Sequence, residues 1–465
     1  MKHGFLDRAS ISSSLLYGAR ILLKGKYEKN PCKTGVWRET SGGMKTQSAS
    51  PDPVDQPSGL QPASPKPEAS KSEAAKPEGL LVGRRLVFEL SGLSALVFFP
   101  LGFYQPFFPL WLSGQHLDAE AIGLVMAMPT ILRVISSPSL SGLADRHIAP
   151  RHLLVVFGVL ACAGWLTLSQ MQSFSAVVVM VSLSTTLMLA MLPLCEVMTL
   201  DAIRAHAQLR YGRLRVWGSL SFMAANMGGG FFIAATSGQN VPYVLAFLCG
   251  LTALFGLFMQ AGLTLPGRVT TTQRRAVKPL PRRLYVLLLG LAAINASYAV
   301  LNGFGPVLWL EQGFAASDVG WLTASSVIAE VYIFIKIGGA SSPKRALLFM
   351  VLGAVAGMLR WSMMAVVGTL VWVALSQLLH ALSYGLFHLG ALAMVTHFAP
   401  FERRARAQGL MSASNGLFYA LTMLAAGPLV SQFGVGAYWA MVPCIALGLV
   451  LIFVACRPVF ARTES

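Results

Sequence analysis

The feature that most constrains the fold is a series of apolar runs, each long enough to cross a lipid bilayer, that recurs between residues 86 and 456. A helix needs about 20 mainly apolar residues to span the hydrocarbon. We therefore predict an all-α membrane protein with twelve transmembrane helices. The runs lie near residues 86–112, 120–142, 152–170, 174–198, 214–236, 242–264, 284–310, 318–338, 345–367, 368–397, 408–431 and 437–456.

Charge is scarce and unevenly placed. Only 12% of the residues are charged, against about 25% in soluble domains, which excludes an ordinary soluble enzyme. Residues 86–465 carry 22 Lys and Arg against 11 Asp and Glu. These basic residues are divided among the connections between apolar runs and form no continuous basic face, so we expect no nucleic-acid partner.

The basic residues alternate from one side to the other. The connections predicted to be cytoplasmic hold nearly all of them, whereas SGQHLDAE, MQS, SGQNVP, EQGFAASD and QFGVG on the other side contain no Lys or Arg. By the positive-inside rule both termini are cytoplasmic.

The long basic stretch around residue 275 divides the spans six and six, and the segment before residue 86 differs in composition. Residues 46–79 are rich in Pro, Ser, Ala, Lys and Glu, which is typical of disorder. Residues 1–30 fit a weak organellar presequence, an interfacial amphipathic helix or an extension with little function. We predict a disordered basic N-terminal tail at 1–85, a six-helix bundle at 86–264, a central cytoplasmic loop at 265–283, a second bundle at 284–456 and a cytoplasmic tail at 457–465.

The two halves contain a short repeat. Residues 109–133 align with residues 306–330, because each segment has an LWL-type end, an acidic connection and a glycine that opens the next helix. Ten residues after that glycine comes a charged residue, Arg133 in one half and Glu330 in the other. Duplicated halves around a midplane site are the usual construction of secondary transporters.

Charged residues at this depth are functional candidates, because a charge in the bilayer centre is costly unless it pairs or faces water. At a rise of 1.5 Å per residue, Arg133, Glu330 and His380 all lie about 18–20 Å from the outer face. Arg133 fits an anion clamp for substrate or a structural ion pair. Glu330 fits a proton-coupling carboxylate or a permanent pair with an Arg or His.

Neighbouring polar residues extend this layer. His380, Tyr384 and His388 follow at i, i+4 and i+8 on one helix face, so His380 is a candidate proton relay, and Tyr384 and His388 are candidate substrate ligands. Tyr104 and Asn302 each stand eight residues before the LWL end of their half. Both fit substrate binding, although buried Tyr and Asn more often serve helix packing.

The segment SGLADRHIAPRH (residues 141–152) resembles the loop motif G-x-L-A-D-R-x-G-R-R of the major facilitator superfamily. The resemblance implies two pseudo-symmetric six-helix bundles, and a cytoplasmic gate that involves Asp145 and Arg146. Ser141 replaces the leading Gly, and the loop of the second half, IGGASSPKRA, lacks the Asp.

A closer resemblance, to the phenylpropionate-permease-like branch related to lactose permease proton symporters, rests on GFYQPFFPLWL, YGRLRVWGS, LRW and LLHALSYGLFHLGA. It implies that Arg360 is the partner of Glu330, although the span map puts Arg360 some 8 Å nearer the outer face. The acid that the lactose permease group carries on its tenth helix is missing, as is the Gly-Pro pair of drug antiporters.

Together these features predict a proton-coupled transporter that imports a small organic solute, with a carboxylate favoured and an aromatic one fitting the resemblance. Its partners would be substrate, protons and the lipid bilayer, in a bacterial inner membrane and as a monomer. A sugar or nucleoside symporter, an exporter, or a transport-inactive receptor or scaffold remain alternatives. No nucleophile, metal-ligand or phosphate-loop pattern occurs, so we expect no enzyme, metal or cofactor.

Overall fold

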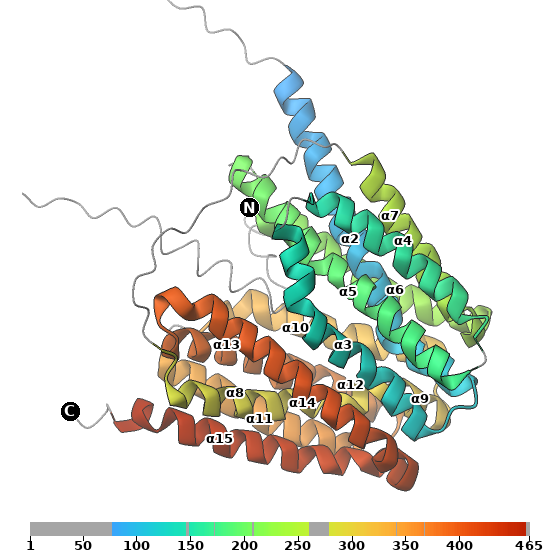
Figure 1. Ribbon diagram of the computed structural model, residues 1–465. Helices are drawn as coiled ribbons and strands as arrows, with labels where there is room; N and C mark the ends of the chain where they lie inside the picture. The colour runs from blue at the N-terminus through green and yellow to red at the C-terminus, as the bar shows by residue number, and fades with distance from the viewer. Residues whose placement is uncertain are drawn as a thin grey trace, which may run out of the picture.

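The computed structural model describes residues 77–145, 148–171, 173–206, 209–259, 279–340, 342–366 and 368–461. All regular secondary structure in these ranges is helical (Figure 1). The helices of the first half are α2 (Pro77–Gly114), α3 (Ala119–Asp145), α4 (Pro150–Leu168), α5 (Phe174–Ala205), α6 (Tyr211–Ala235), the short η1 (Gly238–Asn240) and α7 (Val241–Phe258).

The second half repeats this plan with two of its spans broken. Its helices are α8 (Arg282–Ala296), α9 (Ala299–Glu311), α10 (Ala316–Ile337), α11 (Pro343–Met364), α12 (Leu370–Leu378), η2 (Ala381–Leu386), α13 (Phe387–Phe398), η3 (Phe401–Arg403), α14 (Arg404–Phe433), η4 (Gly434–Ala440) and α15 (Met441–Ala461).

The predicted all-α membrane fold is confirmed, and each of the twelve predicted runs overlaps a helix or a broken helix. Within the described residues, ten stretches are long and apolar enough to cross a membrane, and one of them, Arg406–Arg457, covers most of both α14 and α15. Helix α6, whose sequence includes two arginines, an asparagine and three consecutive glycines, is not among the ten. The twelfth crossing therefore stays a prediction.

Two predicted segments fall outside the described ranges. Residues 1–76 of the predicted tail and residues 265–278 of the predicted central loop are not described, nor are residues 260–264 at the end of the first predicted bundle, nor is Arg146. Helix α2 begins at Pro77, within the range assigned to the tail.

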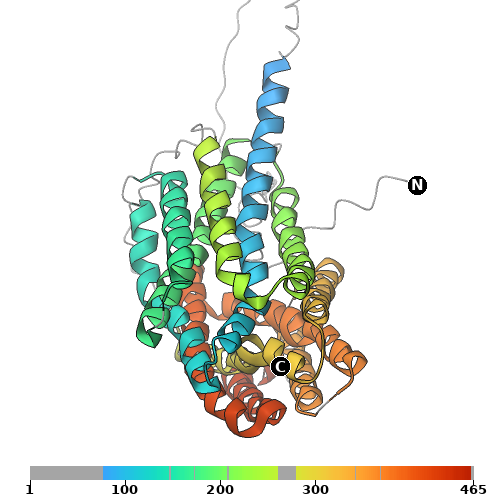
Figure 2. The same ribbon diagram turned by 90° about the vertical axis from the view of Figure 1, so that its right-hand side faces the viewer.

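The chain forms two bundles, α2–α7 and α8–α15 (Figures 1 and 2). They converge at one end and spread apart toward the other (Figure 1). Glycines allow the convergence. A side chain on Gly123 of α3 would meet Gly427 of α14 at 3.3 Å, and one on Gly320 of α10 would meet Gly230 of α6 at the same distance. We call the end that carries these crossings the closed end and the opposite one the open end.

At the open end, the final arginine of the loop motif has a structural partner. Arg151 at the start of α4 donates hydrogen bonds from Nε to the Gly256 carbonyl (2.9 Å) and from Nη2 to the Leu257 carbonyl (2.6 Å). The last carbonyls of a helix lack intrahelical donors, so this guanidinium caps the end of α7.

Candidate functional site

Three residues predicted to handle a proton meet inside the second bundle. Arg360 on α11 is fully buried, and its Nη1 lies 3.0 Å from Nδ1 of His380. The other ring nitrogen of His380, Nε2, lies 3.4 Å from Oε2 of Glu330 on α10. Arg360 and Glu330 form no direct ion pair in the described residues. His380 lies between Arg360 and Glu330 and contacts both, although the sequence places these two residues at different depths in the membrane.

The burial of Arg360 is compensated by polar and aromatic neighbours. Its Nη2 donates a 2.7 Å hydrogen bond to Oε1 of Gln377, and its Cζ lies 5.6 Å from the Tyr298 ring centre and 4.9 Å from that of Trp361. Aromatic faces attract a cation electrostatically. Tyr298 directly follows Ser297, and both lie in the break between α8 and α9. Because the helix is interrupted there, the Tyr298 ring points toward Arg360. In a continuous helix it would point in another direction.

The break in the tenth predicted span is a π-helix, η2, a rare element that frequently occurs at functional sites. Across it the rings of His380 and Tyr384 stack at 5.0 Å, and those of Tyr384 and His388 at 6.0 Å. The predicted stripe of three rings on one face is therefore present. Gly385 allows α10 to approach, because a side chain there would meet Cγ of Glu330 at 3.3 Å.

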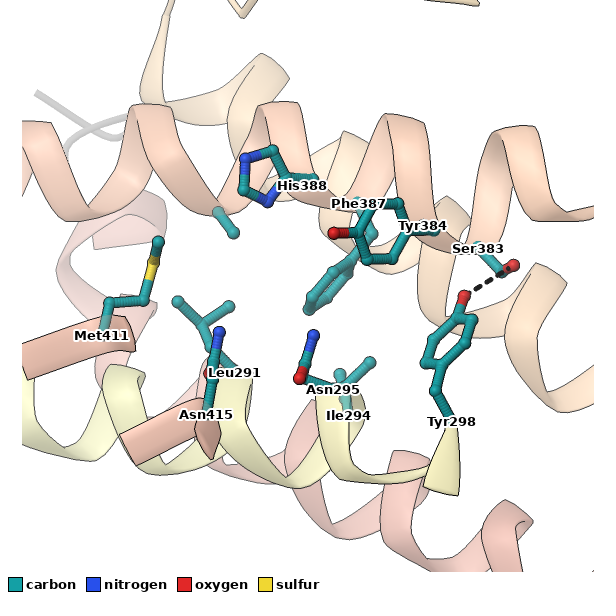
Figure 3. A pocket seen from close by; sticks show the side chains of 11 residues that line it. Leu291, Ile294, Asn295, Tyr298, Ser383, Tyr384, Phe387, His388, Met411 and Asn415 are labelled. Carbon is teal, nitrogen blue, oxygen red and sulfur yellow. Dashed lines mark hydrogen bonds between the residues drawn. The ribbon is translucent and has the colours of Figure 1, made fainter. Parts of the chain in front are cut away.

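A small polar cavity adjoins this stripe (Figure 3). Asn295 of α8 and Asn415 of α14 point toward Tyr384 and His388 across it. The cavity has room for about one water molecule. No Asp, Glu, Lys or Arg lines it. Asn295 is not among the residues that the sequence indicated. The presence of an Asn within an apolar span could have identified it as a candidate.

Arg133 lies at the junction of the bundles, outside this cavity. Its neighbour Val134 packs against α14 so closely that a side chain on Gly416 would meet Val134 Cγ2 at 2.8 Å. Arg133 is exposed and pairs with no carboxylate of the described residues. The Tyr419 hydroxyl is close enough to interact with its charge, and Asn302 lies within hydrogen-bonding reach of the same hydroxyl.

The remaining sequence candidates are placed differently. Tyr104 is buried in the first bundle, where its ring stacks on Phe108 at 4.8 Å and lies 5.9 Å from Trp165. These contacts are those of a packing residue. Asp145 ends α3, but its side chain lies outside the described part of the structure, as does Arg146 of the predicted gate.

The structure also contains a buried charge cluster that the sequence did not indicate. Arg215 of α6 is 5% exposed, and its Nε lies 3.1 Å from Oε1 of Glu196 on α5. Tyr211 donates a hydrogen bond to the other Glu196 oxygen, and the guanidinium sits 3.6 Å from the Phe98 ring centre of α2. Arg215 is the second residue of the run predicted at 214–236. Its i+4 spacing from Tyr211 was the signal that both share a helix face.

Two membrane-embedded helical bundles, with ionisable side chains at the bundle junction and inside each bundle, are typical of a secondary transporter. Residues 87–441 match the model of the MFS_1 like family. The chain belongs to this family within the major facilitator superfamily, as the loop motif predicted.

Two relatives are each 27% identical in sequence to this chain over the aligned residues. The protein named "Probable 3-phenylpropionic acid transporter" of Escherichia coli (strain K12) aligns over 74% of this chain and 91% of its own length. The "Maltose permease" of Geobacillus stearothermophilus aligns over 82% and 97%. The predicted resemblance to the phenylpropionate branch is confirmed.

Solved structures show the same fold at lower identity. The nucleoside transporter NupG has a TM-score of 0.67 at 18% identity and covers 80% of this chain and 98% of its own. A bacterial homologue of the lysosomal transporter Spinster, solved inward-facing and occupied, has a TM-score of 0.62 at 14% identity, over 83% and 98%. The chain is thus an integral multi-pass membrane transporter with a small-molecule substrate, and not an enzyme.

Proposed function

We propose that this protein is a proton-coupled symporter that imports a small organic carboxylate, with an aromatic carboxylate favoured. It works as a monomer in the bacterial inner membrane, with both termini in the cytoplasm. The observation that carries the proposal is the contrast between the two halves. Arg133 is exposed at the bundle junction and pairs with no carboxylate of the described residues, whereas Glu330 is held in a buried network with Arg360.

The substrate side of the proposal starts from Arg133. A guanidinium binds a carboxylate through two parallel hydrogen bonds, and Arg133 has no carboxylate of the described residues to occupy it. Tyr419 lies beside it and Asn302 lies beside Tyr419, while Tyr384 and His388 face the polar cavity of the second bundle. These side chains supply hydrogen bonds and aromatic surface for the body of the substrate. We assign Tyr104 a role in helix packing and not in substrate binding.

The proton side depends on Glu330. Adding one proton to Glu330 changes the net charge of its buried network by one. Because interactions between charges are strong away from water, this change can favour one arrangement of the bundles over another.

Alternating access follows from the arrangement of the bundles. Under the orientation that the basic residues predict, the open end faces the cytoplasm, so the structure corresponds to an inward-facing state. Transport would then require the glycine crossings at the closed end to separate and the open end to close.

The test is uptake of radiolabelled 3-phenylpropionate by the purified protein in liposomes with an imposed pH gradient. We expect accumulation that disappears when an ionophore collapses the gradient. Glu330→Gln should keep exchange of labelled for unlabelled substrate but lose gradient-driven accumulation. Accumulation by Glu330→Gln equal to the wild type would disprove the proton role. Wild-type uptake that ignores the pH gradient would disprove proton coupling itself.

A sugar substrate is the second candidate, because the maltose permease aligns at the same identity as the phenylpropionate protein. The cavity amides of Asn295 and Asn415 also suit hydroxyl groups. Thermal-shift measurements with 3-phenylpropionate, maltose and uridine distinguish the classes. The carboxylate proposal expects a shift with the first compound alone.

A further inference from the structure

The hydrogen-bonding roles in the Arg360–His380 contact follow from the chemistry of the two side chains. A guanidinium has five N–H donors and no acceptor. The 3.0 Å contact between Arg360 Nη1 and His380 Nδ1 is therefore a hydrogen bond only if Nδ1 accepts it. An imidazole nitrogen that accepts carries no proton, so the single ring proton of His380 sits on Nε2, the nitrogen that faces Glu330 at 3.4 Å.

We propose that Arg360 holds His380 as a neutral imidazole with its proton on Nε2, so that Glu330 alone binds the coupled proton in this network. The inference rests on the proposed proton coupling and sharpens it. His380 becomes a positioning residue that orients the carboxylate, in place of the proton relay that its titration range suggested.

The guanidinium is itself held in place, which keeps the contact directed at Nδ1. Gln377 accepts from Nη2 through its Oε1, while the amide nitrogen of Gln377 contacts Met364 Sδ (3.7 Å) and Ser376 Oγ (3.4 Å). The amide can therefore not turn to present its nitrogen without losing these contacts. The Trp361 ring beneath the guanidinium is fixed by a hydrogen bond from its Nε1 to Ser297 Oγ (3.0 Å).

Binding of a second proton to His380 is unfavourable. It would sit on Nδ1 and point at Arg360, so the hydrogen bond would be lost and two cations would stand in contact away from water. The other groups around the ring do not offset this. Tyr298 lies edge-on at 5.8 Å and donates its hydroxyl to Ser383, and Tyr384 stacks on the ring at 5.0 Å. Glu330 is the single carboxylate among these neighbours.

A proton on Glu330 meets no such obstacle. Neutral Glu330 still accepts from His380 Nε2 through its carbonyl oxygen, and the pair loses no hydrogen bond. The bridge thus lets the carboxylate change its charge while His380 and Arg360 keep theirs.

Nuclear magnetic resonance tests the state of His380 without any substrate. The chain has eight histidines, and the difference between ¹⁵N-histidine-labelled wild type and His380→Gln identifies the His380 signals. We expect an unprotonated Nδ1 and a protonated Nε2 at every point between pH 8 and pH 5. A proton on Nδ1, or conversion to imidazolium in that range, would overturn the proposal.

An Arg360→Met variant tests the cause. Without the guanidinium, His380 should become doubly protonated within the same pH range, which a purely structural role of Arg360 would not produce. Gel filtration confirms that the variant is folded. An Nδ1 that stays unprotonated in a folded Arg360→Met protein would show that Arg360 does not set the state of His380.

Transport by His380 variants supplies a second, independent measure. Gln can accept from Arg360 through its oxygen and donate to Glu330 through its nitrogen, but it cannot carry a proton; Leu can do neither. We expect His380→Gln to accumulate 3-phenylpropionate under a pH gradient at a reduced rate, and His380→Leu to lose accumulation. If His380→Gln exchanges substrate but does not accumulate it, His380 itself must carry the coupled proton, and the proposal is wrong. Failure of the wild type to respond to the gradient would instead refute the coupling, while the resonance result would still decide the protonation state.

Discussion

Two arginines in this protein have opposite surroundings. Arg360 is buried next to aromatic rings and hydrogen-bonds to Gln377 and His380, so its charge interacts with other protein groups. Arg133 is exposed at the bundle junction and pairs with no carboxylate of the described residues. The first suits a fixed structural charge and the second suits a ligand contact.

Replacement of Arg133 should therefore discriminate between substrates by charge. A hydrogen bond to a charged group contributes about 1.5–3 kcal/mol, so Arg133→Ala should weaken 3-phenylpropionate binding about 10- to 100-fold. Binding of the neutral analogue 3-phenylpropanol should change little. Thermal-shift titration measures both, and Arg133→Lys, which keeps the charge without the planar fork, should fall between wild type and Ala. Equal losses for both ligands would favour a structural pair.

At the level of helices, the first bundle is joined by the buried cluster of Arg215, Glu196 and Tyr211. It connects α5 and α6 and rests on Phe98 of α2. Removing one partner of a buried ion pair leaves the other charge uncompensated, which costs more than the pair itself contributes.

Glu196→Gln should accordingly destabilise the protein by about 3–5 kcal/mol. Tyr211→Phe, which removes one hydrogen bond and leaves the ion pair, is the matched control and should cost about 1–3 kcal/mol. Thermal melting in detergent followed by tryptophan fluorescence ranks the two variants. A smaller loss in Glu196→Gln than in Tyr211→Phe would contradict the account of the cluster.

The helix crossings at the closed end support a prediction about conformation. A side chain on Gly427 would meet the Ala119 carbonyl at 2.6 Å, and one on Gly230 would meet the Ala316 carbonyl at 2.8 Å. Backbone atoms cannot move aside as side-chain ends can, so Gly427→Leu and Gly230→Leu should force the bundles apart there. Gly228, which has no atom within 4 Å of such a side chain, supplies the control Gly228→Leu.

Pulsed electron spin resonance between labels at residues 115 and 312, one in each half, detects the change. The distance distribution should lengthen in the two crossing variants and stay unchanged in Gly228→Leu. An unchanged distribution in all three would show that the crossings do not hold the closed end together.

At the scale of the whole molecule, periodic apolar runs and the placement of basic residues were sufficient to predict two helical bundles. The same pattern did not show that Arg215 pairs with Glu196, because the position of a residue in an apolar run does not tell which helix faces its side chain. Depth along the membrane also separated Arg360 from Glu330. Only the packing shows His380 between them, since the bridge depends on the direction of side chains around three helix axes. The π-helix η2 and the break at Ser297 set those directions, and no proline marks either in the sequence.

The role of the segment before α2 separates a transporter from a receptor or scaffold. Both bundles and all the ionisable groups of the proposed mechanism lie between Pro77 and Ala461. Transport by alternating access needs those bundles alone, so a chain beginning at residue 77, with an added initiator methionine, should accumulate 3-phenylpropionate as the full chain does. The measurement is uptake per reconstituted molecule in the same liposomes. A scaffold would keep its membrane insertion and lose its cellular phenotype on this deletion. Loss of uptake with normal insertion would instead give the N-terminal segment a direct part in transport, which no contact of the described residues supplies.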